Sequence, residues 1–227
     1  MCYSPGLCER ILSQNFKYGT LVFYSQQVYN IFMVTCILLS AGLSRRFGSP
    51  KALAKWHKET VLEHLQKMLI ETQVNEIIVV LGAYAKRVKP YLLDHKKVKF
   101  VYNKDFNFGQ TSSFKSGLED VSNDTRGVML LPVDYPLISP NTIDLLIRHF
   151  LDHSPHVLIP AFEGKKGHPP LFSSTLRDEF LALDNASGLN TVAQAHQSQT
   201  VIYPVDDIGV VSTFNTLDEF ELIKDLK

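Results

Sequence analysis

Cysteine is scarce in this chain of 227 residues, which contains only Cys2, Cys8 and Cys36. Three cysteines do not make an even set of disulfides, none of them forms a C-x-x-C pair, and two lie within the first eight residues. A disulfide-stabilised secreted domain does not have this pattern. We therefore expect a cytoplasmic protein.

The chain also lacks an excess of charge and a long hydrophobic run. Its 23 basic residues balance its 23 acidic ones, so no overall field attracts nucleic acid or an acidic membrane, and we expect neither partner. The longest apolar stretch near the start, residues 31–39, contains Thr35 and is too short to span a bilayer. Polar residues at positions 25–30 interrupt any secretory signal.

Apolar residues are plentiful enough for a large core, at 45% of the chain, which excludes disordered, collagen-like and coiled-coil proteins. Residues 1–32 show no sustained period, and we interpret them as an N-terminal extension of unknown role. An alternative is that Met33 is the true start. Residues 33–227 are expected to form one domain.

From residue 34, short β-branched runs alternate with amphipathic helical segments, a pattern typical of a mostly parallel sheet covered by helices. The expected strands are 34–40, 76–81, 99–103, 128–133, 156–160, 170–172 and 200–204. The expected helices are 60–72, 83–93, 112–121, 140–153, 175–183, 189–195 and 217–225. The predicted fold class is therefore α/β: a single three-layer α/β/α domain with a Rossmann-like sheet.

Two local signals refine this prediction. Ser139 directly before Pro140 is the expected N-cap of the helix 140–153. Residues 163–167, E-G-K-K-G, look like a turn between antiparallel strands. That turn makes the predicted sheet mixed near one edge.

The loop at residues 38–51 has the composition of a phosphate-binding segment. It reads L-L-S-A-G-L-S-R-R-F-G-S-P-K after a hydrophobic strand. Glycines let backbone N–H groups approach phosphate oxygens, and Arg and Lys neutralise the phosphate charge. The spacing fits neither a P-loop nor a dinucleotide fingerprint. Composition alone leaves two interpretations, a phosphate loop and an exposed basic turn.

The same loop resembles the L-A-A-G-x-S-x-R-M-G-x-P-K signature of the molybdenum cofactor cytidylyltransferases, which are molybdopterin-type NTP transferases of the nucleotide-diphospho-sugar transferase-like superfamily. Ser40 and Phe47 are mild departures from it. The resemblance covers residues 34–227 and continues through four segments: G-Q-T-S-S-F-K-S-G-L at 109–118, P-V-D-Y-P at 132–136, G-H-P-P-L-F at 167–172 and F-N-T-L-D-E-F at 214–220. The first motif indicates only the superfamily, whereas 109–113 and 167–172 indicate the cytidylyltransferase branch.

This resemblance implies transfer of a nucleotidyl group from an NTP, with CTP as the first candidate, to the phosphate of molybdopterin cofactor. Pyrophosphate is released and Mg²⁺ is the implied cofactor. Contact with molybdoenzymes or their chaperones is also implied. The alternatives are guanylyl transfer to the same cofactor, transfer to a sugar or polyol phosphate, and a binding module without turnover.

Nucleotidyl transfer is an in-line displacement at the α-phosphorus, which needs positioned groups that stabilise phosphoryl charge. The loop residues assigned to the nucleotide and its leaving phosphates are Ala41, Gly42, Leu43, Ser44 and Arg46. Lys51 is assigned to the α-phosphate on the resemblance. Arg45, at a variable position of the signature, is the less certain cation of the loop, and the alternative is that it faces water.

Two residues are predicted to hold Mg²⁺. Asp134 follows the apolar run 128–133, at the carboxyl end of a strand, where α/β sheets bind ligands. Asn215 stands where the cytidylyltransferase branch reads D-x-D-T-P-E-D-L, and an asparagine carbonyl still suits the ion. The alternatives are a turn aspartate and a helix N-cap.

The remaining site predictions concern the two substrates. Gln110, Ser112 and Ser113 precede a helix and are expected to contact the nucleotide, with helix capping by the serines as an equal alternative. On the resemblance, His168 and Lys166 contact the acceptor, although either residue taken alone indicates only a surface or structural role. Nearby aromatic residues are expected to pack within strand and loop: Phe100, Tyr102, Phe106 and Phe108.

Overall fold

The computed structural model describes residues 33–226, so the predicted N-terminal extension lies outside the described residues. Within them, the main sheet contains eight strands: β1 Met33–Ser40, β4 Glu76–Leu81, β5 Val98–Tyr102, β6 Thr125–Pro132, β7 Val157–Phe162, β8 Lys165–Lys166, β9 Leu171–Ser173 and β10 Thr200–Pro204. A separate hairpin pairs β2 Lys55–Trp56 with β3 Glu59–Thr60. All seven predicted strands are present within two or three residues of their expected ends.

The helices of the described residues are α3 Val61–Ile70, α4 Ala85–Val88, α5 Gln110–Glu119, α6 Pro140–His153, α7 Arg177–Ala182, α8 Asn190–Ala195 and α9 Leu217–Lys224. Short 3₁₀ turns are η1 Lys51–Leu53, η2 Lys89–Tyr91, η3 Phe106–Phe108, η4 Ser174–Leu176, η5 Gln197–Gln199 and η6 Ile208–Val210. The predicted helix 83–93 is wrong as one unit. Pro90 has no N–H to continue the α-helical ladder, and the segment changes to η2 at that turn.

The sheet order is β10-β7-β9-β6-β1-β4-β5, with β8 paired to β7. β1 lies inside the sheet and runs parallel to both β4 and β6, which explains its continuous apolar sequence. The predicted antiparallel turn is confirmed: Glu163 and Gly164, with φ of 47° and 79°, join β7 to β8. The other antiparallel strand, β9, lies between β6 and β7, third from the β10 edge, so the sheet is mixed toward that edge as predicted.

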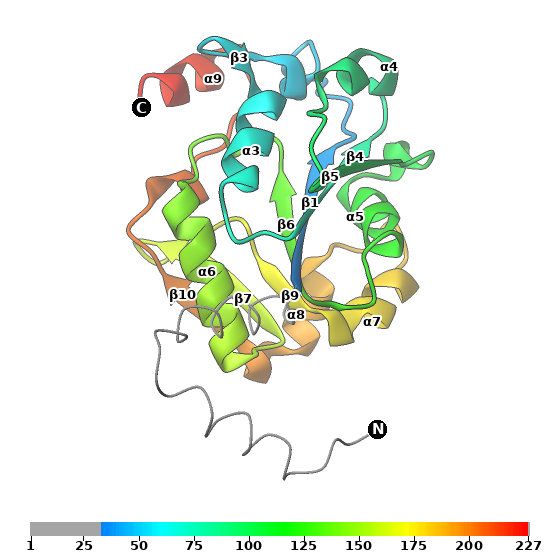
Figure 1. Cartoon of the computed structure of the whole chain (residues 1–227), viewed down its shortest axis with the longest axis vertical. Coiled ribbons are helices and arrows are strands. Elements are labelled where there is room, and N and C mark those ends of the chain that lie inside the picture. The colour runs from blue at the N-terminus through cyan, green and yellow to red at the C-terminus, as the bar shows by residue number, and fades with distance from the viewer. Residues whose placement is uncertain (1–32, 227) are drawn as a thin grey trace, which may run out of the picture. The chain divides into compact units, whose positions relative to one another are not determined.

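Helices cover both faces of the sheet (Figure 1). On one face, Cys36 and Leu38 of β1 belong to a core that includes residues of α3, α6 and α9. On the other face, Ile37 and Leu39 pack with residues of α5, α7 and α8. This arrangement confirms the predicted three-layer α/β/α fold. None of the described helices is long and apolar enough to cross a membrane.

The parallel pairing brings the loops after β1 and β6 to the same edge of the sheet, because both strands end there. The predicted N-cap of α6 is confirmed, since Ser139 Oγ accepts a hydrogen bond from the Thr142 amide. The predicted aromatic packing is wrong for Phe100 and Tyr102, which are 43% and 52% exposed on the edge strand β5, and for Phe108 of η3, which is 63% exposed.

Candidate active site

The loop after β1 folds into a tight turn that positions Lys51. The amides of Phe47 and Gly48 donate to the Ser44 carbonyl at 3.1 and 3.0 Å, and Ser44 Oγ accepts from the Lys51 amide at 3.3 Å. Ser44 and Gly48 both have positive φ, which glycine adopts without steric cost. Phe47 and Pro50 are buried, whereas Arg45 and Arg46 are exposed, so the loop is a partly exposed basic turn and the phosphate-loop interpretation stays a prediction.

An aromatic cluster fixes this loop to the segment before α9. The ring of Phe47 lies 5.3 Å from that of Phe214 and 5.7 Å from that of Phe220, centroid to centroid. Phe214 is fully buried. The glycine-rich loop and Asn215, which follows Phe214, are therefore held in one place although they are far apart in sequence.

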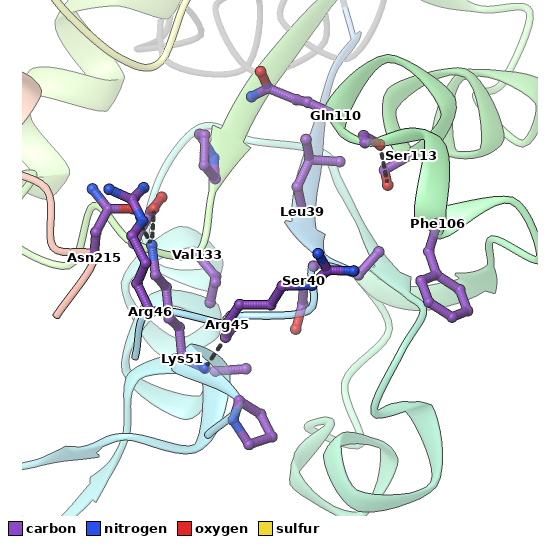
Figure 2. A pocket seen from close by; sticks show the side chains of 18 residues that line it. Leu39, Ser40, Arg45, Arg46, Lys51, Phe106, Gln110, Ser113, Val133 and Asn215 are labelled. Atoms are coloured by element: carbon purple, nitrogen blue, oxygen red, sulfur yellow. Dashed lines mark hydrogen bonds and ion pairs between the residues drawn. The ribbon is translucent and has the colours of Figure 1, made fainter. Parts of the chain in front are cut away.

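Two cations and two oxygen-bearing side chains meet where the loops come together (Figure 2). Lys51 Nζ lies 2.7 Å from Asp134 Oδ2 and donates to Asn215 Oδ1 at 2.9 Å. Arg46 donates to the same Asn215 oxygen at 3.0 Å. Asp134 lies in the turn after β6, as the turn-aspartate alternative expects. Its carboxylate also forms an ion pair with Lys51, so it belongs to this cluster.

Lys51 and Asp134 are largely sheltered from solvent, with 12% and 21% of their side chains exposed, whereas Arg46 is exposed. Lys51 Nζ also lies 5.3 Å from the centroid of the Phe214 ring, which stabilises a cation. Charges in such a partly desolvated place interact more strongly than they do in water. A phosphate that enters here meets two preorganised cations.

Asn215 is not the cap of the last helix. Thr216 is the N-cap of α9: its Oγ1 accepts from the Glu219 amide, and the Glu219 carboxylate accepts from the Thr216 amide. The Asn215 amide also donates to Glu219. The helix-cap interpretation of Asn215 is therefore wrong, and its side-chain oxygen faces the cations instead.

The donor set fits a hard dication such as Mg²⁺. Asp134 Oδ2 and Asn215 Oδ1 both approach the Lys51 ammonium within 3 Å, so two oxygen ligands converge on one cation position. In the described part of the chain, no three His, Cys, Asp or Glu side chains group closely enough to hold a metal by themselves. An ion here therefore takes its other ligands from phosphate and water, as Mg²⁺ commonly does.

A cavity of about 350 Å³ opens beside this cluster and is lined by most of the residues predicted for the nucleotide. Those that line it are Ala41, Gly42, Ser44, Arg46, Lys51, Gln110, Ser113, Asp134 and Asn215. Leu43 and Ser112 do not; the Leu43 carbonyl accepts from the Tyr84 hydroxyl instead. The cavity therefore brings together the loop, the start of α5 and the cation cluster.

The serines of α5 do not cap their helix. Gly109 is the N-cap residue, and the hydroxyls of Ser112 and Ser113 both donate to its carbonyl at 3.0 Å. The buried Asn103 side chain donates to both hydroxyls. The capping alternative is therefore wrong, and this network fixes the start of α5 against the end of β5.

Sequence reasoning left one residue of the cavity open and missed another. Arg45, the less certain cation of the loop, lines the cavity and extends toward the side formed by Phe106 (Figure 2). Phe106 belongs to η3, where it lines the cavity rather than only packing in a loop. Its position three residues before Gly109 is the signal that might have been used, since the loop before α5 was already expected at the site.

A second cavity, of about 380 Å³, holds the residues predicted for the acceptor. His168 and Lys166 line it, and Gln110 belongs to both cavities. The rings of Tyr135 and His168 pack against each other at a tilt of 33°, with centroids 4.5 Å apart. Burial lowers the pKa of His168, although the nearby Asp134 opposes this shift. A neutral imidazole is therefore favoured, and it can accept a proton.

Comparison with known proteins agrees with this architecture. The family described as "MobA-like NTP transferase domain" matches residues 36–201. A Bacillus cereus protein named probable molybdenum cofactor guanylyltransferase is 28% identical over 130 residues, which are 57% of this chain and 62% of that protein. The match thus spans less than two thirds of that relative. The Escherichia coli molybdenum cofactor cytidylyltransferase is 22% identical over 85% of this chain and 96% of its own length.

Solved structures share the fold. The crystal structure of Rv0371c from Mycobacterium tuberculosis covers 86% of this chain and 99% of its own, with a TM-score of 0.73 and 22% identity. Another structure of that protein is described as a complex with manganese, and has a TM-score of 0.63, 21% identity and coverage of 86% and 98%.

Proposed function

Because this chain belongs to the family of MobA-like NTP transferase domains, we propose that it transfers a nucleotidyl group from an NTP to the phosphate of a molybdopterin-type cofactor. The observation that carries the proposal is the convergence of Lys51, Arg46, Asp134 and Asn215 beside a glycine-containing loop. Such a cluster supplies the charge that phosphoryl transfer needs.

In the proposed reaction, an oxygen of the acceptor phosphate attacks the α-phosphorus. The bond from the α-phosphorus to the oxygen that bridges to the β-phosphorus breaks, and pyrophosphate leaves. Lys51 stabilises the charge on the α-phosphate, while Arg46 and the backbone of Gly42 and Ser44 hold the departing phosphates. Arg45 adds a third cation on the opposite side of the cavity.

Asp134 and Asn215 would hold Mg²⁺ in this proposal. The bound ion supplies neutralisation of triphosphate charge that the side chains alone do not provide. Lys51 has to exchange its contact with Asp134 for a phosphate contact when the nucleotide binds. Lys51 and Arg46 also have to release Asn215 Oδ1 before both oxygens are free for the dication.

The acceptor is proposed to bind in the second cavity, against His168 and Lys166. Gln110 lines both cavities, so an acceptor phosphate there lies next to the nucleotide. A neutral His168 can accept a hydrogen bond from the acceptor group. Delivery of the product to molybdoenzymes or their chaperones belongs to the same proposal.

CTP is the first candidate nucleotide because the segments 109–113 and 167–172 resemble the cytidylyltransferase branch and the Escherichia coli relative aligns over nearly its whole length. GTP is the second, since the Bacillus relative is named as a guanylyltransferase.

The test is pyrophosphate release with each of the four NTPs, with and without molybdopterin, at saturating Mg²⁺. We expect release only when both the cofactor and one preferred NTP are present, and we expect the Lys51→Ala variant to be nearly inactive. Pyrophosphate release with a sugar or polyol phosphate, and not with molybdopterin, would show that the sugar or polyol phosphate is the acceptor. NTP binding without any release would indicate a binding module.

A further inference from the structure

The segment 86–104 combines positive charge with exposed aromatic side chains. It contains seven basic residues and one acidic residue, Asp94, in a chain whose total charge is zero. Tyr91, Phe100 and Tyr102 are 38%, 43% and 52% exposed. The segment runs through α4, η2 and β5 and ends next to the candidate active site.

The lysines of this segment differ in the contacts that they form within the described residues. Lys97 donates to the carbonyls of Ile70 and Thr72, and Lys99 pairs with carboxylates. By contrast, Lys89 and Lys104 are exposed and form no ion pair within residues 33–226.

Lys89 lies against Phe100, because its Nζ is 4.6 Å from the centroid of that ring. We define the β5 edge surface by the exposed residues of this region, Lys89, Tyr91, Phe100, Tyr102 and Lys104.

The backbone of β5 has a free side. β5 is the last strand of the sheet and pairs only with β4 among the described strands. The Asn103 amide donates to the Leu81 carbonyl of β4. Because backbone groups alternate in direction along a strand, the N–H and C=O of Phe100 and Tyr102 point away from β4.

Lysines on an edge strand often serve only to prevent aggregation. Such a protected edge does not also expose two large aromatic side chains on consecutive same-face positions, as Phe100 and Tyr102 do. The edge therefore has the features of a binding strand: free backbone groups, apolar contact area and a charge of one sign.

We propose that the β5 edge surface binds an acidic, extended segment of a partner protein, which adds to the sheet as a strand beside β5. The outward N–H and C=O groups of Phe100 and Tyr102 pair with a peptide backbone, whereas a nucleic acid would leave them unused. Phe106, which follows β5 closely, lines the nucleotide cavity, so a docked partner lies beside the site. The proposal does not depend on the proposed reaction.

The test measures binding of labelled probes to the full chain by fluorescence anisotropy. The probes are a ten-residue peptide of alternating Glu and Val, its Lys and Val counterpart, and a mixed single-stranded DNA oligonucleotide. We expect the acidic peptide to bind and the basic peptide not to bind. Reversing Lys89 and Lys104 to Glu should weaken binding roughly tenfold. Arg148→Glu on α6, a charge reversal at another exposed position, should not change it and is the control for each single reversal.

Two further measurements test the pairing of backbones. Phe100→Ala removes the ring, and Phe100→Pro also removes the outward N–H, so the proline variant should bind several-fold more weakly than the alanine variant. In the wild-type chain, hydrogen exchange at residues 98–102 should slow when the acidic peptide is added.

Unchanged exchange at 98–102, no binding of the acidic peptide, or tighter binding of the oligonucleotide through Phe100 would each overturn the proposal. Pyrophosphate release by these variants, measured in parallel, shows whether the proposed reaction fails independently.

Discussion

The ammonium of Lys51 lies 2.7 Å from the carboxylate of Asp134, although 83 positions separate the two residues. The contact joins the loop after β1 to the turn after β6, and Asn215 completes it from a third segment. The Lys51 ammonium thus contacts both oxygen-bearing side chains that are proposed to hold Mg²⁺. Variants of these residues therefore test the site most directly.

Lys51→Ala should lower kcat by roughly two to three orders of magnitude, as does the loss of one preorganised donor to a transition state. The measurement is steady-state pyrophosphate release. Lys55→Ala removes an exposed lysine close by and serves as the control, which should keep its rate. A Lys51→Ala enzyme with wild-type turnover would remove this lysine from the mechanism.

Asp134 and Asn215 should respond oppositely in Mg²⁺ titrations. Asp134→Asn removes the only carboxylate of the pair and should nearly abolish activity even at high Mg²⁺. Asn215→Asp adds a second negative oxygen and should lower the Mg²⁺ concentration for half-maximal rate, whereas Asn215→Ala should raise it. Thermal melts exclude unfolding. An unchanged Mg²⁺ requirement in both Asn215 variants would leave Asp134 as the sole protein ligand.

Alanine substitutions at two glycines near the loop should have different effects, one on the stability of the fold and the other on NTP binding. A Cβ at Gly82 would lie 2.5 Å from the Ala41 carbonyl oxygen, so Gly82→Ala should cost about 1–3 kcal/mol and lower Tm by several degrees. A Cβ at Gly42 meets nothing within 4 Å, and Gly42→Ala should keep its Tm but weaken NTP binding. Calorimetry and nucleotide titration distinguish the two, and equal Tm losses would contradict this explanation.

Ser40→Ala should stabilise the fold. Within the described residues, the Ser40 hydroxyl is buried and has no hydrogen-bond partner, so removing it relieves a desolvation cost of about 1–2 kcal/mol. The matched control is Thr35→Val at another buried position of β1, where the hydroxyl contacts Thr125 Oγ1 at 2.9 Å and its loss should destabilise. Chemical denaturation measures both, and destabilisation by Ser40→Ala would reveal an unrecognised partner.

His196 should stabilise the fold only at low pH. Its hydrogen bond to Glu179, at 2.8 Å, raises its pKa above the ordinary value, while partial burial acts in the opposite direction. The stabilisation is complete below the unfolded pKa of about 6.5 and is lost as the pH rises through the folded pKa. His196→Gln should therefore lower Tm at pH 5.5 and have little effect at pH 9. A constant Tm difference across this range would mean that charge is not the cause.

The sequence predicted the regular elements well because apolar runs and helical periods are local signals. β4 and β10 begin and end where expected, and α6 has the predicted bounds and the predicted N-cap, Ser139. The hairpin β2–β3 was missed because two-residue strands show no period, although it contains Trp56, which is 1% exposed. The interior place of β9 was also missed, since pairing partners depend on contacts far along the chain.

Motif positions identified the loop, Asp134 and Asn215 as site residues, and the structure brings them together. Sequence alone did not reveal that Thr216, and not Asn215, is the N-cap of α9, or that Arg45 lines the cavity. Both depend on how side chains turn after folding. Composition also did not predict that β5 would be an edge strand, and this leaves Phe100 and Tyr102 exposed.

The place of β9 between β6 and β7 constrains the order in which the chain can assemble. β1 can pair with β4 and β6 once residue 132 has been synthesised, but β7 cannot join that sheet directly, because the next position belongs to β9. The carboxyl-terminal third must therefore form its antiparallel segment before β7 and β10 can attach. We expect this late insertion, which closes contacts between distant residues, to limit the rate of folding.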